Sequence, residues 1–256
     1  MNKKVFLSFD VEEFDMPMEY QYAISVEDQM RVGIEGLDAI QPVLDAVPAT
    51  LFTTANFANH FPERIRSLSE KHEIASHTFY HTDYETADLL KSRIRLEEIT
   101  GKKVTGLRMP RMRPVLMKDV LEAGYQYDSS INPTWLPGRY NNFHLPRTAY
   151  KEEGIVRIPA SVSPGIRIPL FWLSFKNMPY TVYKQLCLQT LAKDGYLCLY
   201  FHPWEFTSIE PYGLPGYTRR WCGTKLVDRL IQLVQDLSKE ADFEAMNQFG
   251  FPVLTK

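Results

Sequence analysis

A chain of 256 residues is long enough to bury a substantial core and lies within the size range of one barrel or one large α/β unit. Its formal net charge of −2 argues against general nucleic-acid binding, which needs a basic surface. No repeat, low-complexity stretch or linker divides the chain, so we expect a single domain over residues 1–256.

Short apolar runs alternate with helical patterns along the whole chain. The runs that predict strands are residues 4–10, 49–55, 73–77, 103–110, 125–130, 154–160, 195–203 and 242–249. The helical patterns lie between them, at residues 26–47, 60–72, 84–101, 113–124, 180–192 and 224–240. Such alternation predicts an α/β fold with a mainly parallel sheet, and seven or eight units favour a closed or nearly closed (β/α) barrel. A dinucleotide-binding sheet is less favoured because the fingerprint G-x-G-x-x-G is absent.

The cysteines and the N-terminus bear on the compartment. Cys187, Cys198 and Cys222 are an odd number without metal-binding spacing, which favours a reducing environment. Only five residues separate Lys4 from Asp10, too few for the apolar part of a signal peptide. No run of about 18 apolar residues predicts a transmembrane segment. We therefore expect a cytoplasmic protein.

Polar side chains stand where four of the predicted strands end: Asp10 and Glu12, His77, Arg108, and His202. In barrels of this kind the chemistry sits at the carboxyl ends of the strands, so these groups should meet at one rim. His81 follows His77 by four residues, and we expect the two imidazoles to share one face of a single helical turn.

Two imidazoles and one carboxylate are a usual set of ligands for a catalytic divalent ion that keeps a position for water. Asp10 and Glu12 share a face of a regular strand, so one can bind the metal while the other accepts a proton from the water. Arg108 is the candidate that orients the base, and His202 the candidate acid for a leaving amine. This constellation predicts metal-assisted hydrolysis. Zinc is the first candidate ion, and cobalt, nickel or iron would suit a similar site.

The ordered motifs D-x-E, the histidine pair, R-x-P, YDSS and HPWE together resemble the polysaccharide deacetylase family, the NodB-homology group of metal-dependent carbohydrate esterases, between Asp10 and Glu205. The resemblance implies a distorted (β/α) barrel of about seven parallel strands. It also implies a hydrolase that removes an N-acyl group, usually acetyl, from an amino sugar, glycan or glycolipid intermediate by attack of a metal-bound water.

The resemblance carries a role to each matching position: Asp10 as base, Glu12, His77 and His81 as metal ligands, Arg108 as the arginine that holds the base, and His202 as acid. Many family members have two consecutive aspartates, whereas Val11 stands between Asp10 and Glu12 here, a spacing that looks like that of an intracellular branch. Candidate substrate contacts are Tyr80, Pro110, Asp128, Trp135 and Trp204.

Several residues have simpler interpretations. The histidine pair could cap a helix, His202 could be a satisfied histidine at a strand end, and Asp128 could belong to a turn. Glu13 and Asp15 are expected to be solvated, and the three remaining histidines, His60, His72 and His144, to lie on the surface. Apolar residues of the loop 160–178 could form an exposed patch for a membrane or a lipid-linked sugar, but they more often pack under the loop.

Two other functions stay open from the sequence. The same attack by water would serve an amidase or deformylase acting on another N-acyl group. A non-catalytic carbohydrate-binding relative is the third alternative, although every group that the chemistry needs is present.

Overall fold

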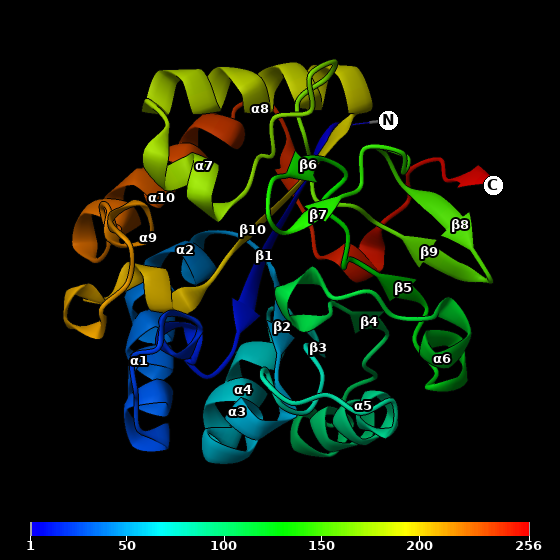
Figure 1. The fold of residues 1–256 in the computed structure, drawn as a ribbon. Coiled ribbons are helices and arrows are strands. Elements are labelled where there is room, and N and C mark those ends of the chain that lie inside the picture. Colours follow the sequence, from blue (N-terminus) through cyan, green and yellow to red (C-terminus); the bar gives the residue numbers. More distant parts are fainter. Residues whose placement is uncertain (1, 256) are drawn as a thin grey trace.

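A parallel sheet forms the centre of the protein, and the computed structural model describes residues 2–255 (Figure 1). Seven strands lie parallel to one another in the order β10-β1-β2-β3-β4-β5-β9. Their bounds are Tyr196–Phe201, Lys4–Val11, Thr50–Thr53, Glu73–Ser76, Gly106–Leu107, Tyr127–Asp128 and Ile155–Arg157. The predicted mainly parallel sheet of about seven strands is confirmed.

Short strands extend the sheet beyond this parallel part. They are β8 (Tyr150–Glu152), which pairs antiparallel with β9, β12 (Leu254–Thr255), which pairs with β8, and β11 (Asp242–Phe243), which pairs with β1. A separate hairpin consists of β6 (Trp135–Leu136) and β7 (Tyr140–Asn141).

The sheet curls into a barrel that is distorted on one side. The chain after β9 completes the curve next to β10, because the amide of Ser161 donates to the carbonyl oxygen of Cys198 at 2.9 Å. The Ser161 hydroxyl in turn accepts a hydrogen bond from the Cys198 amide. Side-chain and irregular backbone contacts therefore replace a regular strand pair on this side.

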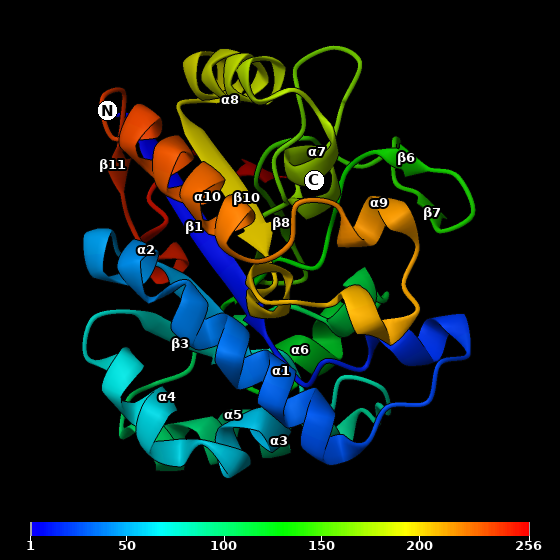
Figure 2. The ribbon, with the colours of Figure 1, turned by 90° about the vertical axis from the view of Figure 1, so that its left-hand side faces the viewer.

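Helices cover the outside of the sheet (Figures 1 and 2). The α-helices are α1 (Val26–Ala39), α2 (Gln41–Ala46), α3 (Ala55–His60), α4 (Pro62–Ser69), α5 (Ala87–Thr100), α6 (Met117–Glu122), α7 (Trp172–Asn177), α8 (Tyr180–Asp194), α9 (Gly216–Arg219) and α10 (Thr224–Leu237). The 3-10 helices are η1 (Met16–Tyr20), η2 (Pro110–Met112), η3 (Pro203–Phe206), η4 (Glu210–Tyr212) and η5 (Met246–Gln248). Within residues 2–255, no helix is long and apolar enough to cross a bilayer.

The predicted helix over residues 26–47 is two helices, which is a correction. Ser25 caps the first one by accepting a hydrogen bond from the Asp28 amide. The second begins at Gln41 with Pro42 in its first turn, and proline has no amide to continue the preceding helix.

Helix α1 lies directly against the segment that carries His202. A methyl group added to Gly36 would come within 2.2 Å of the Pro203 carbonyl oxygen. A glycine at this position therefore lets α1 pack closely against the chain that follows β10. The position of His202, a candidate catalytic residue, thus depends on the packing of this helix.

Candidate metal centre and active site

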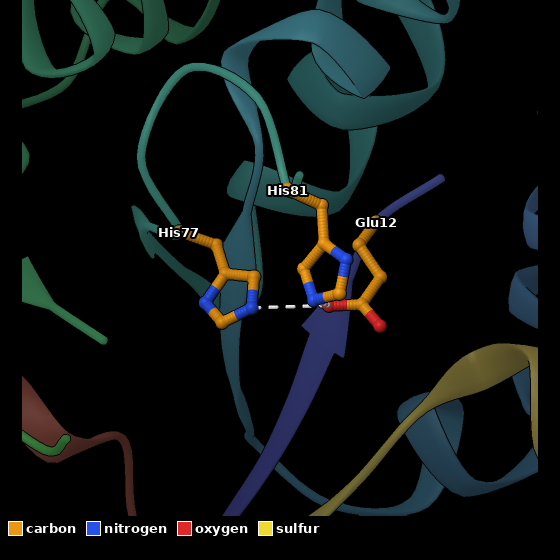
Figure 3. Close-up of side chains that lie close together, drawn as sticks. All are labelled: Glu12, His77 and His81. Carbon is orange, nitrogen blue, oxygen red and sulfur yellow. Dashed lines mark ion pairs between the residues drawn. The ribbon is translucent and has the colours of Figure 1, made fainter. Parts of the chain in front are cut away.

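Glu12, His77 and His81 form a buried cluster just beyond the carboxyl ends of β1 and β3 (Figure 3). Oε2 of Glu12 lies 3.0 Å from Nε2 of His77 and 3.1 Å from Nε2 of His81. All three ligand atoms lie within 4.8 Å of one another. The set is therefore compact enough for one ion with ligand distances of about 2.0–2.2 Å.

The chemistry of the cluster also fits a divalent ion. Oε2 of Glu12 and Nε2 of His77 are buried and have no hydrogen-bond partner within residues 2–255. Buried polar atoms without a partner are rare, and an ion between them would satisfy both. Burial opposes ionisation of Glu12, but the neighbouring imidazoles lower its pKa overall, so the carboxylate is charged and ready to bind.

The expected helical turn at the histidine pair is wrong. Residues 77–84 form a loop, and Thr78 has a left-handed φ of 63°, which a helix cannot contain. The carbonyl oxygen of Thr78 accepts a hydrogen bond from the Ala55 amide at the start of α3. The imidazoles meet because this loop folds back, and their ring centroids are 5.6 Å apart.

Hydrogen bonds on the far side of each imidazole orient it toward the cluster. Nδ1 of His77 lies 2.7 Å from the carbonyl oxygen of Arg108, which can only accept, so this nitrogen carries the proton. Nδ1 of His81 lies 2.7 Å from Oδ1 of Asp15. Both rings therefore present Nε2 to the ion site, an arrangement typical of metal-binding histidines.

Asp15 and Glu13 are buried, so the expectation that they are solvated is wrong. Asp15 also accepts a hydrogen bond from Arg111 at 3.0 Å. Burial opposes protonation of His81, but Glu12 and Asp15 together raise its pKa to about 9. Glu13 accepts a hydrogen bond from the His81 amide at 3.1 Å and so fixes the backbone of this candidate ligand.

Asp10 and Arg108 form a second buried pair beside the cluster. Nη1 of Arg108 donates to Oδ1 of Asp10 at 2.6 Å and to the hydroxyl of Ser8 at 2.9 Å. The other guanidinium nitrogens donate to Ser129, and the group lies over the ring of Phe52. Arg108 is thus held on all sides and fixes one oxygen of Asp10. Oδ2 of Asp10 lies 3.8 Å from Nε2 of His202.

His202 is held by a chain of buried charges. Oε1 of Glu205 lies 3.1 Å from Nδ1 of His202, and Oε2 of Glu205 lies 3.1 Å from Nζ of Lys176. The side chains of Glu205 and Lys176 have no exposed surface. Burial opposes protonation of His202, but Glu205 and the nearby carboxylates raise its pKa above its ordinary value. A histidine with a raised pKa can deliver a proton from its Nε2.

The proposed substrate contacts do not all reach the site. Trp204 is buried, its indole donates to Oε1 of Glu12 at 3.0 Å, and its ring stacks on His202. Asp128 is bonded to Arg157 at 2.8 Å. Tyr80, Pro110, Asp128 and Trp135 are not among the residues that line the cavity above the cluster.

Other residues that line this cavity were not among the site residues predicted from the sequence: Met16, Glu19, Tyr20, Arg111, Met112, Leu136, Arg139, Tyr140, Phe171, Trp172, Leu173, Tyr200 and Tyr217. Most of them come from short helices and from the β6–β7 hairpin, and they belong to no short sequence motif. Residues of the loop 160–178 pack inward: Phe171 and Trp172 are buried, which confirms the packed alternative rather than an exposed patch. Of the histidines expected on the surface, His60 and His144 are exposed but His72 is buried.

Comparisons with known proteins agree with this architecture. Residues 28–127 match the family model described as polysaccharide deacetylase. A search of curated proteins gives no match. A Mycobacterium smegmatis protein described as a polysaccharide deacetylase is 21% identical, with a TM-score of 0.65 over 97% of this chain and 89% of that one.

Two other solved structures share the fold. PuuE allantoinase is 16% identical, with a TM-score of 0.59 over 94% of this chain and 85% of that one. BA3943 of Bacillus anthracis, described as a pseudoenzyme of family CE4, is 10% identical, with a TM-score of 0.50 over 96% of this chain and 65% of that one. At such identities the likeness concerns the fold alone.

Proposed function

Because residues 28–127 match the family model of polysaccharide deacetylases, we propose that the protein is a metal-dependent hydrolase that removes an N-acyl group, in the simplest case acetyl, from an amino sugar. The observation that carries the proposal is the compact Glu12, His77 and His81 cluster beside Asp10 and His202 in one cavity. Cytoplasmic location and the choice of Zn²⁺ over Co²⁺, Ni²⁺ or Fe²⁺ stay predictions.

Each of the proposed site residues has a separate role in the reaction. A divalent ion held by Glu12, His77 and His81 would polarise the acyl carbonyl and lower the pKa of a water from ~15.7 to ~7. Asp10, kept in place by Arg108, takes a proton from the attacking water as its oxygen bonds to the acyl carbon. His202 gives its Nε2 proton to the nitrogen as the carbon–nitrogen bond breaks, which releases the amine and the carboxylate product.

Hydrolysis of a different amide is the second candidate, since the same residues serve any N-acyl nitrogen. The likeness to PuuE allantoinase makes small cyclic amides and ureides useful comparison substrates. The close grouping of the candidate base, its arginine, the candidate ligands and the candidate acid speaks against a purely carbohydrate-binding function.

The test combines metal content with product release. We expect about one divalent ion per chain in the purified protein, and acetate release from N-acetylglucosamine or its oligomers, with both lost in His81→Ala. Absence of metal after incubation with zinc, cobalt and nickel would contradict the metal site. Metal without turnover of any N-acyl sugar, but with turnover of a ureide, would favour the second candidate.

A further inference from the structure

Four of the segments that line the cavity above the cluster form what we call the collar: η1, α9, α7 and the β6–β7 hairpin. Each contributes side chains to the lining, and Asp10, Glu12, His77, His81 and His202 lie at the floor. In Figure 2 the hairpin, α9 and the chain between β1 and α1 lie along the same side of the molecule.

Helix η1 joins its two neighbours across the rim. Its Glu19 carboxylate lies 3.1 Å from Nη2 of Arg139, which stands in the turn between β6 and β7. The hydroxyl of its Tyr20 lies 3.0 Å from the hydroxyl of Tyr217 on α9. Adjacent residues of η1 thus hold the hairpin on one side and α9 on the other.

The remaining contacts complete the ring. Nδ2 of Asn177 on α7 donates to the carbonyl oxygen of Tyr217 at 2.8 Å, which ties α7 to α9. The segment that leads into α7 is tied to the chain just after the hairpin, because Nη1 of Arg167 donates to the carbonyl oxygens of Phe143 and Leu145 at 2.9 Å each. Within the described residues, η1 is therefore bonded to the hairpin and to α9, and α9 to α7, so that the collar segments are joined around the rim of the cavity.

The lining suits one ring and its acyl group. The cavity has a volume of about 110 Å³, whereas pockets for drug-sized ligands span roughly 300–1,000 Å³. Tyr140, Trp172, Tyr200 and Trp204 give it aromatic walls, which can stack on the apolar face of a sugar ring. A polymer bound through an interior residue needs room for the chain on both sides of that residue, and the bonded segments of the collar stand at the rim where the chain would have to pass.

We propose that the site accepts a single acylated unit, either a monosaccharide or the last residue of a chain, and excludes interior residues of a polymer. This inference rests on the proposed function, because it concerns the substrate of that reaction. It also names the collar as the specificity determinant: opening the collar should admit interior residues.

The test uses metal-loaded protein and N-acetylglucosamine oligomers of one to six units, with the deacetylated position read by mass spectrometry of the products. We expect turnover of the monosaccharide or of one terminal position only. In Arg139→Ala/Tyr217→Phe, which removes two bonds of the collar, we expect interior products to rise at least tenfold relative to terminal ones. Arg139→Lys can keep the ion pair and should restore the terminal pattern, and Val182→Ala, on the exposed face of α8, is the neutral control.

Interior deacetylation by the wild-type protein would overturn the inference and leave the proposed function intact. An unchanged product pattern in the folded double variant would show that the collar does not select, and would overturn it as well. If the metal-loaded protein hydrolyses no N-acyl sugar of any length, the proposed function fails and the inference fails with it.

Discussion

Asp15 and His81 form a buried pair in which Oδ1 of Asp15 lies 2.7 Å from Nδ1 of His81, a candidate metal ligand. This pair leaves Nε2 of His81 free to face Glu12. Because a carboxylate behind the imidazole fixes its orientation and tautomer, Asp15 supports the metal site without contacting the ion.

Replacement of Asp15 by asparagine should weaken metal binding. Loss of such a partner costs roughly 10–100-fold in metal affinity, so we expect the dissociation constant for Zn²⁺ of Asp15→Asn to rise by that factor in competition titrations with a chelator. Asp83→Asn, an exposed change in the same loop, is the matched control. Equal affinities in the two variants would mean that Asp15 has no part in the metal site.

Substitutions of Asp10 and of Glu12 should differ in their effects on metal content and on reaction rate. We expect Asp10→Asn to keep near one ion per chain and to lose about 10²–10⁴-fold in rate, as for a general base. Glu12→Gln should lose the ion itself, because an amide is a weaker ligand than a carboxylate. Metal analysis beside acetate release measures both, and the reverse pattern would exchange the two roles.

Glu205 should set the basic limb of the pH–rate profile. The acid His202 must be protonated to act, and Glu205 raises the pKa of His202. Glu205→Gln removes that charge, so the fall in rate should begin at a lower pH than in the wild type. Glu205→Asp should recover part of the shift. A profile that loses amplitude but keeps its basic limb would assign Glu205 a purely structural role.

The Lys176 and Glu205 pair should matter to stability as well. Lys176→Met leaves a buried carboxylate with less compensation, and removal of one partner of a buried ion pair costs about 3–5 kcal/mol. Lys239→Met is the matched control, since that lysine is exposed and pairs with Asp236 at 3.1 Å. An exposed pair contributes about 0–1 kcal/mol. Chemical denaturation measures both free energies of unfolding, and equal losses would contradict the prediction.

Much of the local structure follows from the sequence alone. The strand β10 and the helix α10 lie within the predicted segments. A continuous apolar run predicts the strand, and apolar residues at helical spacing predict the helix. Helix α5 lies within the predicted segment and ends before Gly101, because glycine adopts the left-handed φ of 68° that closes a helix. The parallel order of the strands follows from their alternation with helices.

The groups of the candidate site could also be listed from the sequence, since strand ends in this fold share one rim. Asp10, Glu12, His77 and His202 each stand at or just after the end of a strand, where local pattern predicts them. Local pattern could not show how His81 reaches the cluster, because a left-handed residue at Thr78, stabilised by contacts with α3, decides the path of that loop.

Only the tertiary structure decided which carboxylates are buried and which residues surround the substrate. Asp15 contacts His81, which is distant from it in the sequence. Glu205 and Lys176 form an ion pair because folding places both at the same buried position. The collar depends on contacts such as Glu19 with Arg139, 120 residues apart. Sequence periodicity reports neighbours within one element, whereas charge burial and cavity shape depend on how separate elements meet.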